Sequence, residues 1–409
     1  MLLGLLLRHL VCRGTLVVIE PGGQTHRFGD GTGPGITMRL HDRSVSRKLF
    51  FNPRLQLGEA FMNGTVSFDD ATIYDFLNFI GLNLTLAPRG LLTPLYNGFG
   101  HALRFIDQYN PLGRARQNVA HHYDLSDTLY DLFLDADRQY SCAYFNQPDL
   151  SIEEAQARKK RHIAAKLLLS PGARVLDIGC GWGGLALYLA RECNVFVTGL
   201  TLSKEQLAVA ERRAAAAGLA DRVRFELSDY REHEGRYDRI VSVGMFEHVG
   251  VVHYPTFFRR VKGLLAEDGV ALLHSIGRFD GPSVTNPWIR KYIFPGGYVP
   301  AMSEVLPVVE RTGLLVTDVE ILRLHYAETL RAWRLRFNAN RERIRTLYDE
   351  RFCRMWEFYL AASEVAFRSQ GHMNFQMQLA RRLEVVPLTR DYITDWERSH
   401  RAPAAERAA

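Results

Sequence analysis

Cysteine is scarce in this sequence, and the few cysteines are scattered. The 409 residues include five, at Cys12, Cys142, Cys180, Cys193 and Cys353, and no two of them form a Cys-x-x-Cys pair. An odd, scattered set is typical of reduced thiols and not of a disulfide framework or a zinc site. We therefore expect a cytoplasmic protein with no metal site.

Long apolar runs are also missing. No uninterrupted apolar stretch reaches the roughly 18 residues that a spanning helix needs, so we expect at most peripheral contact with a membrane. Residues 1–8 are apolar but short, with no basic start and no small-residue cleavage site, and they make a poor signal peptide.

Positive charge is only mildly in excess of negative charge. Lysine and arginine number 51 against 45 acidic residues, which gives a net charge of +6. This balance is compatible with an anionic partner, either nucleic acid or a membrane surface, and equally with a basic surface that has no role. The length favours one large domain with a smaller one beside it.

The most informative stretch is residues 174–184. Val175–Ile178 is typical of a strand buried in a parallel sheet, four glycines follow, and 185–191 has helical character. The glycines lack the G-x-G-x-x-G spacing of a dinucleotide site. Asp177 and the G-x-G-x-G-G run after it instead resemble motif I of the methyltransferases that use S-adenosylmethionine (SAM).

Strands and helices then alternate along the chain. The predicted strands after the glycine turn are 194–199, 223–227, 239–243 and 270–274. This pattern predicts an α/β fold with a doubly wound parallel sheet and ligands at the carboxyl ends of its strands. Together with the resemblance to motif I, it implies the Rossmann-like fold of the class I SAM-dependent methyltransferases.

Three units are predicted in chain order. Residues 1–85 form a small α+β domain, with strands at 14–19, 24–28 and 36–40 and helices at 57–62 and 73–79. Residues 86–117 are a linker rich in Pro, Gly and Arg, which either contacts a membrane or packs on the catalytic domain. Residues 118–409 form the catalytic domain with helical additions.

Two charged stretches of the catalytic domain carry further expectations. On the amphipathic helix predicted at 152–169, the run Arg158–Arg161 is interpreted as a solvated face. From residue 327 onward the chain is predicted to be helical. Eight arginines stand against four acids in 331–360, which makes this part a second candidate for contact with an anionic surface, although exposed helix faces are usually charged anyway.

Polar residues follow the second and third predicted strands. Many nucleotide-binding sheets have an acid after the second strand to bind ribose, and this chain has Gly199 and Leu200 there. Gln206 is a candidate for that role, while Ser203 and Gln206 also fit a helix capping box. Asp229 and Tyr230 stand where an adenine ring is usually bound.

Glu247, His248 and His274 come next. Glu247 and His248 follow the fourth strand, where a carboxylate acts either as a general base or as a helix-start residue. A lone histidine at the end of the fifth strand, such as His274, is more often a packing residue. Glu247 and His274 nevertheless end adjacent strands of the predicted sheet, so we expect them at one site.

Taken together, these motifs resemble the cyclopropane-fatty-acyl-phospholipid synthases and their relatives, the mycolic acid cyclopropane synthases. The resemblance covers about residues 118–390, and residues 1–85 match the longer enzymes that act on phospholipids. The matching segments are His122–Leu125, Tyr140–Phe145, Leu176–Gly184, Gly199–Ser203, Phe246–Gly250, Tyr292–Gly297 and His325–Trp333.

The resemblance implies a reaction in which SAM methylates the cis double bond of a phospholipid acyl chain, and a bound bicarbonate removes a proton so that a cyclopropane ring closes. The implied anion-site residues are Glu247, His274, Tyr326, Cys142 and the backbone of Ile276. The predicted cofactor-binding residues are Tyr140, Ser141, Asp177, Gly179, Cys180, Gly181, Trp182, Gly183, Thr201, Leu202, Gln206, Asp229 and Tyr230.

Several alternatives stay open. Tyr123, Tyr140, Tyr144 and Phe246 either face a carbocation through their rings or line an acyl pocket. Ser363 stands where the family often has a cysteine in the late helix, so no covalent cysteine role is expected there.

The motifs do not distinguish a cyclopropane product from a methyl- or methylene-branched chain. A rival class, a basic nucleic-acid methyltransferase, would need base-stacking and phosphate motifs, whereas the surroundings of the site are apolar and aromatic. We therefore expect an unsaturated phospholipid in the membrane as partner, no nucleic acid, and a peripheral location on the inner face of the membrane; the resemblance also allows a homodimer.

Overall fold

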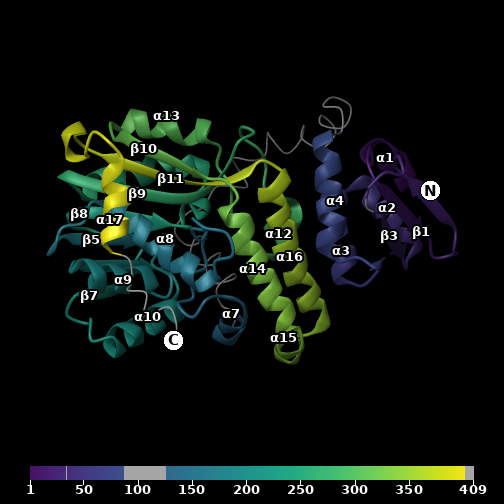
Figure 1. The fold of residues 1–409 in the computed structure, drawn as a ribbon, viewed down its shortest axis with the longest axis horizontal. Coiled ribbons are helices and arrows are strands. Elements are labelled where there is room, and N and C mark those ends of the chain that lie inside the picture. Colours follow the sequence, from purple (N-terminus) through teal and green to yellow (C-terminus); the bar gives the residue numbers. More distant parts are fainter. Residues whose placement is uncertain (34, 87–125, 401–409) are drawn as a thin grey trace.

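A computed structural model describes residues 1–33, 35–86 and 126–400 (Figure 1). The predicted linker 86–117, apart from its first residue, lies outside the described residues, as do Tyr123 and the motif His122–Leu125. No helix in the described part of the chain has the length and apolar character needed to cross a bilayer.

The N-terminal unit is built on a four-stranded sheet of order β2-β1-β3-β4. β1 (Thr15–Ile19) turns Leu16 and Val18 into the core, as alternation along a strand requires. It pairs antiparallel with β2 (Thr25–Phe28) and parallel with β3 (Gly35–Leu40), and the hairpin was predicted. β4 (Val66–Asp69) was not predicted. The helices of this unit are α1 (Leu3–Leu10), α2 (Arg43–Phe51), α3 (Pro53–Met62) and α4 (Ile73–Leu86).

The catalytic domain is built on a seven-stranded sheet of order β10-β11-β9-β8-β5-β6-β7 (Figure 1). Five neighbouring strands are parallel: β5 (Arg174–Ile178), β6 (Phe196–Thr201), β7 (Val223–Leu227), β8 (Tyr237–Val243) and β9 (Leu265–Arg278). The predicted α/β fold is thus confirmed. The sheet is mixed, however, because β11 (His372–Ala380) runs antiparallel to both β9 and β10 (Leu315–Leu322).

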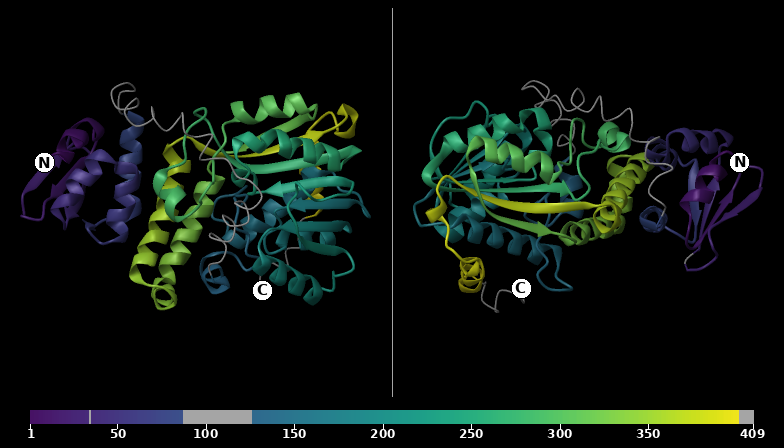
Figure 2. Two further views of the ribbon diagram at one scale, coloured as in Figure 1. Left: turned by 180° about the vertical axis from the view of Figure 1, so that it is seen from behind. Right: turned by 90° about the horizontal axis from the view of Figure 1, so that it is seen from above.

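Helices cover both faces of this sheet (Figure 2). α8 (Ile152–Leu167), α9 (Gly184–Cys193) and α10 (Lys204–Ala216) share one apolar core with one face. α11 (Tyr254–Leu264) and α13 (Met302–Thr312) share another core with the opposite face, and α17 (Asp391–Ser399) packs beside α8. The doubly wound arrangement leaves the carboxyl ends of the parallel strands at one edge, where the predicted site residues lie.

A helical layer separates the sheet from the N-terminal unit. α14 (His325–Ala339) packs against α16 (Glu350–Ser369), which in turn contacts α3 and α4, with α7 (Asp127–Phe133), α12 (Pro287–Tyr292) and α15 (Arg341–Leu347) around them (Figure 1). Because β11 follows α16, the prediction that the chain is helical from residue 327 onward was wrong.

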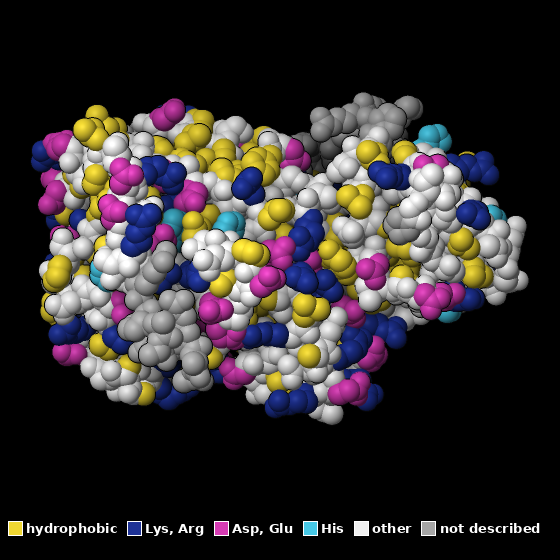
Figure 3. All heavy atoms as spheres, viewed as in Figure 1, with side chains coloured by type: hydrophobic (Ala, Val, Ile, Leu, Met, Phe, Trp, Pro, Cys, Tyr) yellow, Lys and Arg dark blue, Asp and Glu magenta, His cyan; other side chains and the backbone are white. Residues whose placement is uncertain are grey.

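Most of the arginines predicted as a surface for anions are paired within this layer. The paired residues, each within 4.0 Å of a carboxylate, are Arg331, Arg334, Arg336, Arg341, Arg345 and Arg354. Figure 3 likewise shows acidic and basic side chains interspersed on the face it draws. Ion pairing therefore offsets much of the positive charge of the helical layer, and the excess of arginine in its sequence overstates its basic character.

The prediction of a solvated face at Arg158–Arg161 was wrong for one residue. Lys159 is fully buried in α8. Its position, four residues after Ala155 and four before Ile163, places it on the stripe of the helix that faces the core.

Candidate active site

The turn between β5 and α9 can be made only by glycine at several of its positions. Gly179, Gly181 and Gly183 have φ of 87°, 55° and 81°, in the left-handed region that disfavours other residues. A Cβ on Gly179 would lie 2.8 Å from Met245 Cβ, and one on Gly183 would lie 2.6 Å from Phe225 Cζ. The backbone therefore turns tightly and leads directly into the N-terminus of α9.

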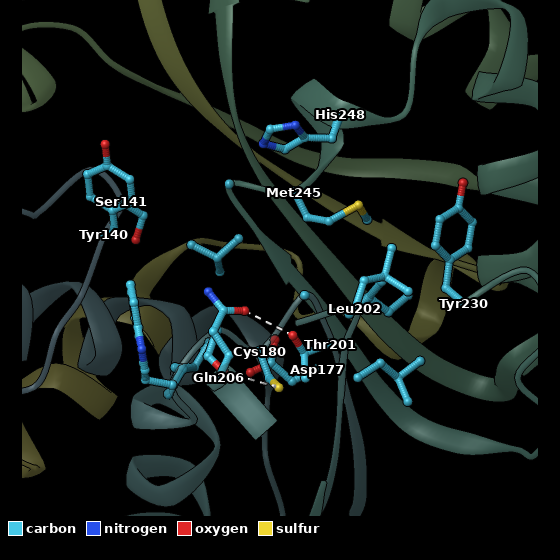
Figure 4. Close-up of a pocket in the computed structure, with 18 of the residues that line it drawn as sticks. Tyr140, Ser141, Asp177, Cys180, Thr201, Leu202, Gln206, Tyr230, Met245 and His248 are labelled. Carbon is cyan, nitrogen blue, oxygen red and sulfur yellow. Dashed lines mark hydrogen bonds between the residues drawn. The ribbon is translucent and has the colours of Figure 1, made fainter. Parts of the chain in front are cut away.

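An open cavity, of about 1270 Å³ with its solvent-filled mouth included, lies at this turn (Figure 4). Every predicted cofactor-binding residue except Gly183 lines it: Tyr140, Ser141, Asp177, Gly179, Cys180, Gly181, Trp182, Thr201, Leu202, Gln206, Asp229 and Tyr230. Gly183 instead forms the start of α9. We call this space the turn cavity.

Asp177 and Gln206 are two polar groups with capacity for a ligand in the turn cavity. Asp177 is buried, its Oδ2 accepts no hydrogen bond from a described residue, and burial raises its pKa to about 7. Gln206 Oε1 accepts from Thr201 Oγ1 at 2.9 Å, and Figure 4 shows the amide nitrogen directed into the cavity. The predicted capping box is half formed: the Gln206 backbone N–H donates to Ser203 Oγ, but the Gln206 side chain bonds Thr201.

Asp229 is largely engaged within the protein. Its carboxylate accepts from the backbone N–H of Arg231 at 2.9 Å and from the Arg231 guanidinium at 2.8 and 2.7 Å. A carboxylate offers about four lone-pair positions, so one remains for a ligand. The neighbouring Tyr230 is buried and also lines the turn cavity.

A second cavity, of about 690 Å³ with its solvent-filled mouth included, adjoins the first. All five predicted anion-site residues line it: Cys142, Glu247, His274, Ile276 and Tyr326. Half of its twelve other lining residues are large aliphatic or aromatic ones: Tyr140, Ile289, Phe294, Tyr298, Val299 and Tyr359. We call it the apolar cavity. It shares Tyr140, Ser141, Gly244 and His248 with the turn cavity, so ligands in the two cavities would meet at these residues.

Glu247 lies in a short 3₁₀ turn, Phe246–His248, that follows β8. Its Oε1 accepts the backbone N–H of Ile276 at 2.6 Å, and its Oε2 accepts no hydrogen bond from any described residue. Burial raises the pKa of Glu247 to about 7. The Ile276 N–H, predicted to bind an anion directly, is therefore engaged by Glu247, and the free acceptor is Glu247 Oε2.

His274 is adjacent in the sheet to Val243, the last residue of β8, which brings it to the same site as Glu247. Its ring nitrogens lie 2.7 Å from Asn374 Nδ2 and 3.1 Å from Gln376 Nε2, both on β11. Burial lowers the pKa of His274 well below its usual value, so the ring is neutral. Both nitrogens have partners, and a direct hydrogen bond from His274 to an anion would require one partner to be exchanged.

Two of the predicted aromatic residues do not reach either cavity. Phe246 is fully buried and packs on Tyr254 and Phe257, and Tyr144 stacks between the rings of His162 and His325. Their predicted roles, facing a cation or lining the acyl pocket, were therefore wrong. Tyr140 does line both cavities, and its hydroxyl lies 2.9 Å from that of Tyr359. Ser363, on α16, lines neither cavity.

Sequence reasoning missed part of the apolar wall. His248, weighed with Glu247 as a possible base, lines both cavities, and burial lowers its pKa to about 4, so it is neutral near pH 7. Ile289, Phe294 and Tyr359 come from α12, the loop after it and α16, whose apolar residues cannot be told from ordinary core by their spacing.

The strand order, the glycine turn and the cavity at the carboxyl ends of the strands define a SAM-dependent methyltransferase. The family model described as mycolic acid cyclopropane synthetase matches residues 111–377. The chain is 42% identical over 379 residues to a probable fatty acid methyltransferase of Pseudomonas putida, covering 87% of this chain and 89% of that protein. It is 37% identical over 359 residues to the cyclopropane-fatty-acyl-phospholipid synthase of Escherichia coli strain K12, covering 87% and 90%.

Solved structures agree with these relationships. The mycolic acid cyclopropane synthase CmaA1, crystallised with S-adenosylhomocysteine (SAH) and CTAB, superposes with a TM-score of 0.62 and 35% identity, covering 67% of this chain and 99% of that one. The chain belongs to the mycolic acid cyclopropane synthetase family. It is a SAM-dependent methyltransferase related to enzymes that modify lipid acyl chains.

Proposed function

We propose that this enzyme forms a cyclopropane ring at the cis double bond of an unsaturated phospholipid acyl chain, with SAM as the methylene source. The observation that carries the proposal is the pair of adjoining cavities, one at the glycine turn and one apolar. The name of the E. coli relative supports the phospholipid substrate. The SAH in the CmaA1 crystals supports SAM as the occupant of the turn cavity.

The residues of the turn cavity fit SAM chemically. Bound SAM supplies an electrophilic methyl group on a sulfonium sulfur. Asp177 Oδ2 and the Gln206 amide offer an acceptor and a donor for its polar groups, and the glycine turn lets backbone approach it closely. Tyr140 and Ser141 line both cavities and would hold the cofactor where the two cavities meet.

The apolar cavity would hold the alkene in place. An alkene is a weak nucleophile, so orientation must supply much of the rate enhancement. Ile289, Phe294 and Val299 offer an alkyl chain an apolar wall that also excludes water. Tyr140 and Tyr326 place aromatic rings at the same wall, where positive charge develops.

The base in the proposal is a bicarbonate ion held beside Glu247. Glu247 Oε2 is a buried acceptor able to receive the bicarbonate hydroxyl, and Tyr326 and Cys142 lie in the same cavity as further contacts. Bicarbonate supplies the proton acceptor. His274 supports the site through Asn374 and Gln376, which hold its neutral ring in place.

A second candidate function diverts the same cation to a methyl- or methylene-branched chain. The P. putida relative, named a probable fatty acid methyltransferase, favours this alternative to the same degree as the E. coli relative favours a ring. Both outcomes use one donor and one cavity, so they differ in product and not in site.

The location in the cell belongs to the proposal as well. We place the enzyme in the cytoplasm, peripheral on the inner face of the membrane, where its phospholipid substrate lies, and we include a homodimer as its assembly. The mild net charge of +6 supports contact with anionic lipid. We assign no nucleic-acid partner.

The direct test supplies purified enzyme with methyl-labelled SAM and vesicles of an unsaturated phospholipid, with RNA as a competing acceptor. We expect label in the lipid acyl chain and none in RNA; label in RNA alone would contradict the proposal. Removal of bicarbonate from the buffer should slow the reaction, and an unchanged rate would exclude bicarbonate as the base.

A paired mutational test addresses the anion site. Glu247→Gln and His274→Ala should lower kcat by about a hundredfold or more while changing SAM affinity by less than about threefold. Wild-type turnover in both variants would show that the anion site is misplaced.

A further inference from the structure

Lys159 is a buried ammonium group for which the reaction described so far has no use. It lies on the core-facing stripe of α8, fully buried, while its neighbours in the Arg158–Arg161 run are more exposed. Lysine is rarely buried without a charged partner, because its ammonium loses hydration that neutral groups replace poorly. A buried lysine in the second layer of a cleft therefore requires an explanation.

The contacts of Lys159 all lead to the segment between the two cavities. Its Nζ donates to Gln139 Oε1 at 2.7 Å and to Ser141 Oγ at 2.8 Å. Within the described residues no carboxylate oxygen lies within 4.0 Å of it, and Asp135 and Asp137 attract its charge from farther away. Gln156, one turn earlier on α8, donates to the backbone carbonyls of Gln139 at 3.0 Å and Ser141 at 2.9 Å. We call residues 139–142 the strap.

The strap forms the wall where the two cavities meet. Tyr140 and Ser141 line both cavities, and Cys142 lines the apolar one. Two α8 side chains thus anchor it, one neutral and one charged. Gln156 holds its backbone, whereas Lys159 holds its side chains and adds a positive charge directly behind them.

The charge of Lys159 reaches groups on both sides of the strap. Burial raises the pKa of Cys142 and of Asp177, and the Lys159 ammonium opposes both shifts. Burial lowers the pKa of His274, and Lys159 lowers it further. Cys142 and His274 line the apolar cavity, and Asp177 lines the turn cavity. The charge of Lys159 therefore acts on both cavities.

We propose that Lys159 is a positioning residue that holds the strap between the cavities and supplies a positive potential that retains an oxyanion in the apolar cavity. This role rests on the proposed function, because the oxyanion is its base. The geometry separates two duties: hydrogen bonds to Gln139 and Ser141 fix the strap, and the buried charge, which no carboxylate of the described residues contacts directly, favours an anion beside it.

The sign of this electrostatic potential can be measured by ligand binding, without enzyme turnover. A positive charge behind the strap disfavours the sulfonium of SAM relative to the neutral thioether of SAH, since the two ligands differ by one charge at sulfur. Loss of the charge should therefore improve the affinity for SAM relative to SAH. Loss of anchoring alone should change both affinities together.

The test compares Lys159→Met with Gln156→Leu, which removes two anchoring hydrogen bonds to the strap and no charge. Calorimetric titration gives the Kd of SAM and of SAH for each folded variant, with folding checked by circular dichroism. We expect Lys159→Met to shift the ratio of Kd for SAM to Kd for SAH toward SAM by about threefold or more, and Gln156→Leu to leave the ratio unchanged. A wild-type ratio in Lys159→Met would overturn the proposal.

If Lys159→Met does not fold, Lys159→Gln replaces it in the test, because glutamine keeps a hydrogen-bond donor and lacks the charge. We expect the same shift in the ratio of Kd for SAM to Kd for SAH. The bicarbonate concentration for half-maximal rate provides the second readout. It should rise about tenfold in the lysine variant and stay near wild type in Gln156→Leu; equal changes in both would reduce Lys159 to an anchor and overturn its electrostatic role.

The proposed base and the proposed role of Lys159 can be refuted separately. A wild-type rate independent of bicarbonate would refute the proposed base, and the SAM-to-SAH ratio would still decide whether Lys159 sets the potential. An unshifted ratio with a bicarbonate-dependent wild type would refute the role of Lys159 and leave the proposed function intact.

Discussion

Two buried carboxylates at the site have raised pKa values, one at each cavity. Asp177 faces the turn cavity and Glu247 the apolar one, and each has an oxygen that accepts no hydrogen bond from the described residues. Burial raises the pKa of each to about 7, so both groups change charge in the range where the enzyme must operate. Such groups are retained at a cost to stability, which favours a functional role for both.

The pKa of Glu247 predicts a pH dependence of turnover. If the ionised carboxylate receives the bicarbonate hydroxyl, kcat should rise with pH through about 7 and then level off. Glu247→Gln should lack this rising limb. Steady-state rates between pH 5 and about 9 measure it, with Glu205→Gln, on the exposed first turn of α10, as the control that should keep the wild-type profile. An unaltered limb in Glu247→Gln would contradict the role given to this residue.

Asp177 predicts a pH dependence of stability. Because its folded pKa is raised from 3.8 to about 7, the folded protein binds more protons than the unfolded chain between these values. Its contribution to stability is therefore present at low pH and is lost as pH rises toward 7. Asp177→Asn should flatten this part of the dependence of Tm on pH and weaken SAM binding about tenfold. Thermal melts and calorimetry across this pH range measure both, and a parallel Tm curve would contradict the prediction.

At the scale of elements, α12 links the N-terminal unit to the apolar cavity. Trp288 of α12 packs on Gly58 of α3 and donates to Met62 Sδ at 3.2 Å, and Ile289, the next residue, lines the cavity. Lys291 and Tyr292 bind Glu59 from the same helix. A change at this contact should therefore move a wall of the cavity.

Gly58→Ala tests this link. A Cβ there would lie 2.4 Å from Trp288 Nε1, so the ring must move, at a cost of about 1–3 kcal/mol. We expect a lower Tm and weaker binding of the acyl substrate with little change in SAH affinity. Gly263→Ala, on an open face of α11, is the matched control and should be neutral or slightly stabilising. Equal behaviour of the two variants would exclude the link.

β11, which was not predicted, provides the hydrogen-bond partners of His274, whose position was predicted. His274 was predicted beside Glu247 from strand order, and the register of β8 with β9 confirms this placement. Its ring partners Asn374 and Gln376 could not be foreseen, because β11 was taken for helix. The alternation of Met373, Phe375 and Met377 with polar residues was a strand signal in the sequence. β11 is buried on both sides, so its polar residues serve the interior and not solvent.

Other parts of the site followed from local rules. The glycine turn was predictable because tight turns impose φ values that few residues other than glycine adopt. The burial of Lys159 was not, because four consecutive basic residues normally mark a solvated face and its partners Gln139 and Ser141 lie about 20 residues away. Contacts between side chains that are distant in sequence, rather than element type, mark the limit of prediction here.

At the scale of the whole molecule, the proposed membrane association predicts a dependence on lipid charge and salt. The net charge is +6, so the enzyme should float with vesicles that contain anionic lipid more than with zwitterionic ones. Raising the salt concentration should release it, because screening weakens attraction between exposed charges. Equal flotation with both vesicle types at all salt concentrations would argue against this electrostatic attachment. Within the described residues no group of three or more His, Cys, Asp or Glu side chains is arranged to hold a metal ion.

The identity of the lipid product tests the central claim most directly. The chain would be expressed in a host that lacks such modifications, and its fatty acid methyl esters would be analysed by gas chromatography–mass spectrometry and proton NMR. The account predicts acyl chains that gain one CH₂ and contain a cyclopropane ring at the position of the former double bond. A methyl branch or an exocyclic methylene in place of the ring would contradict it.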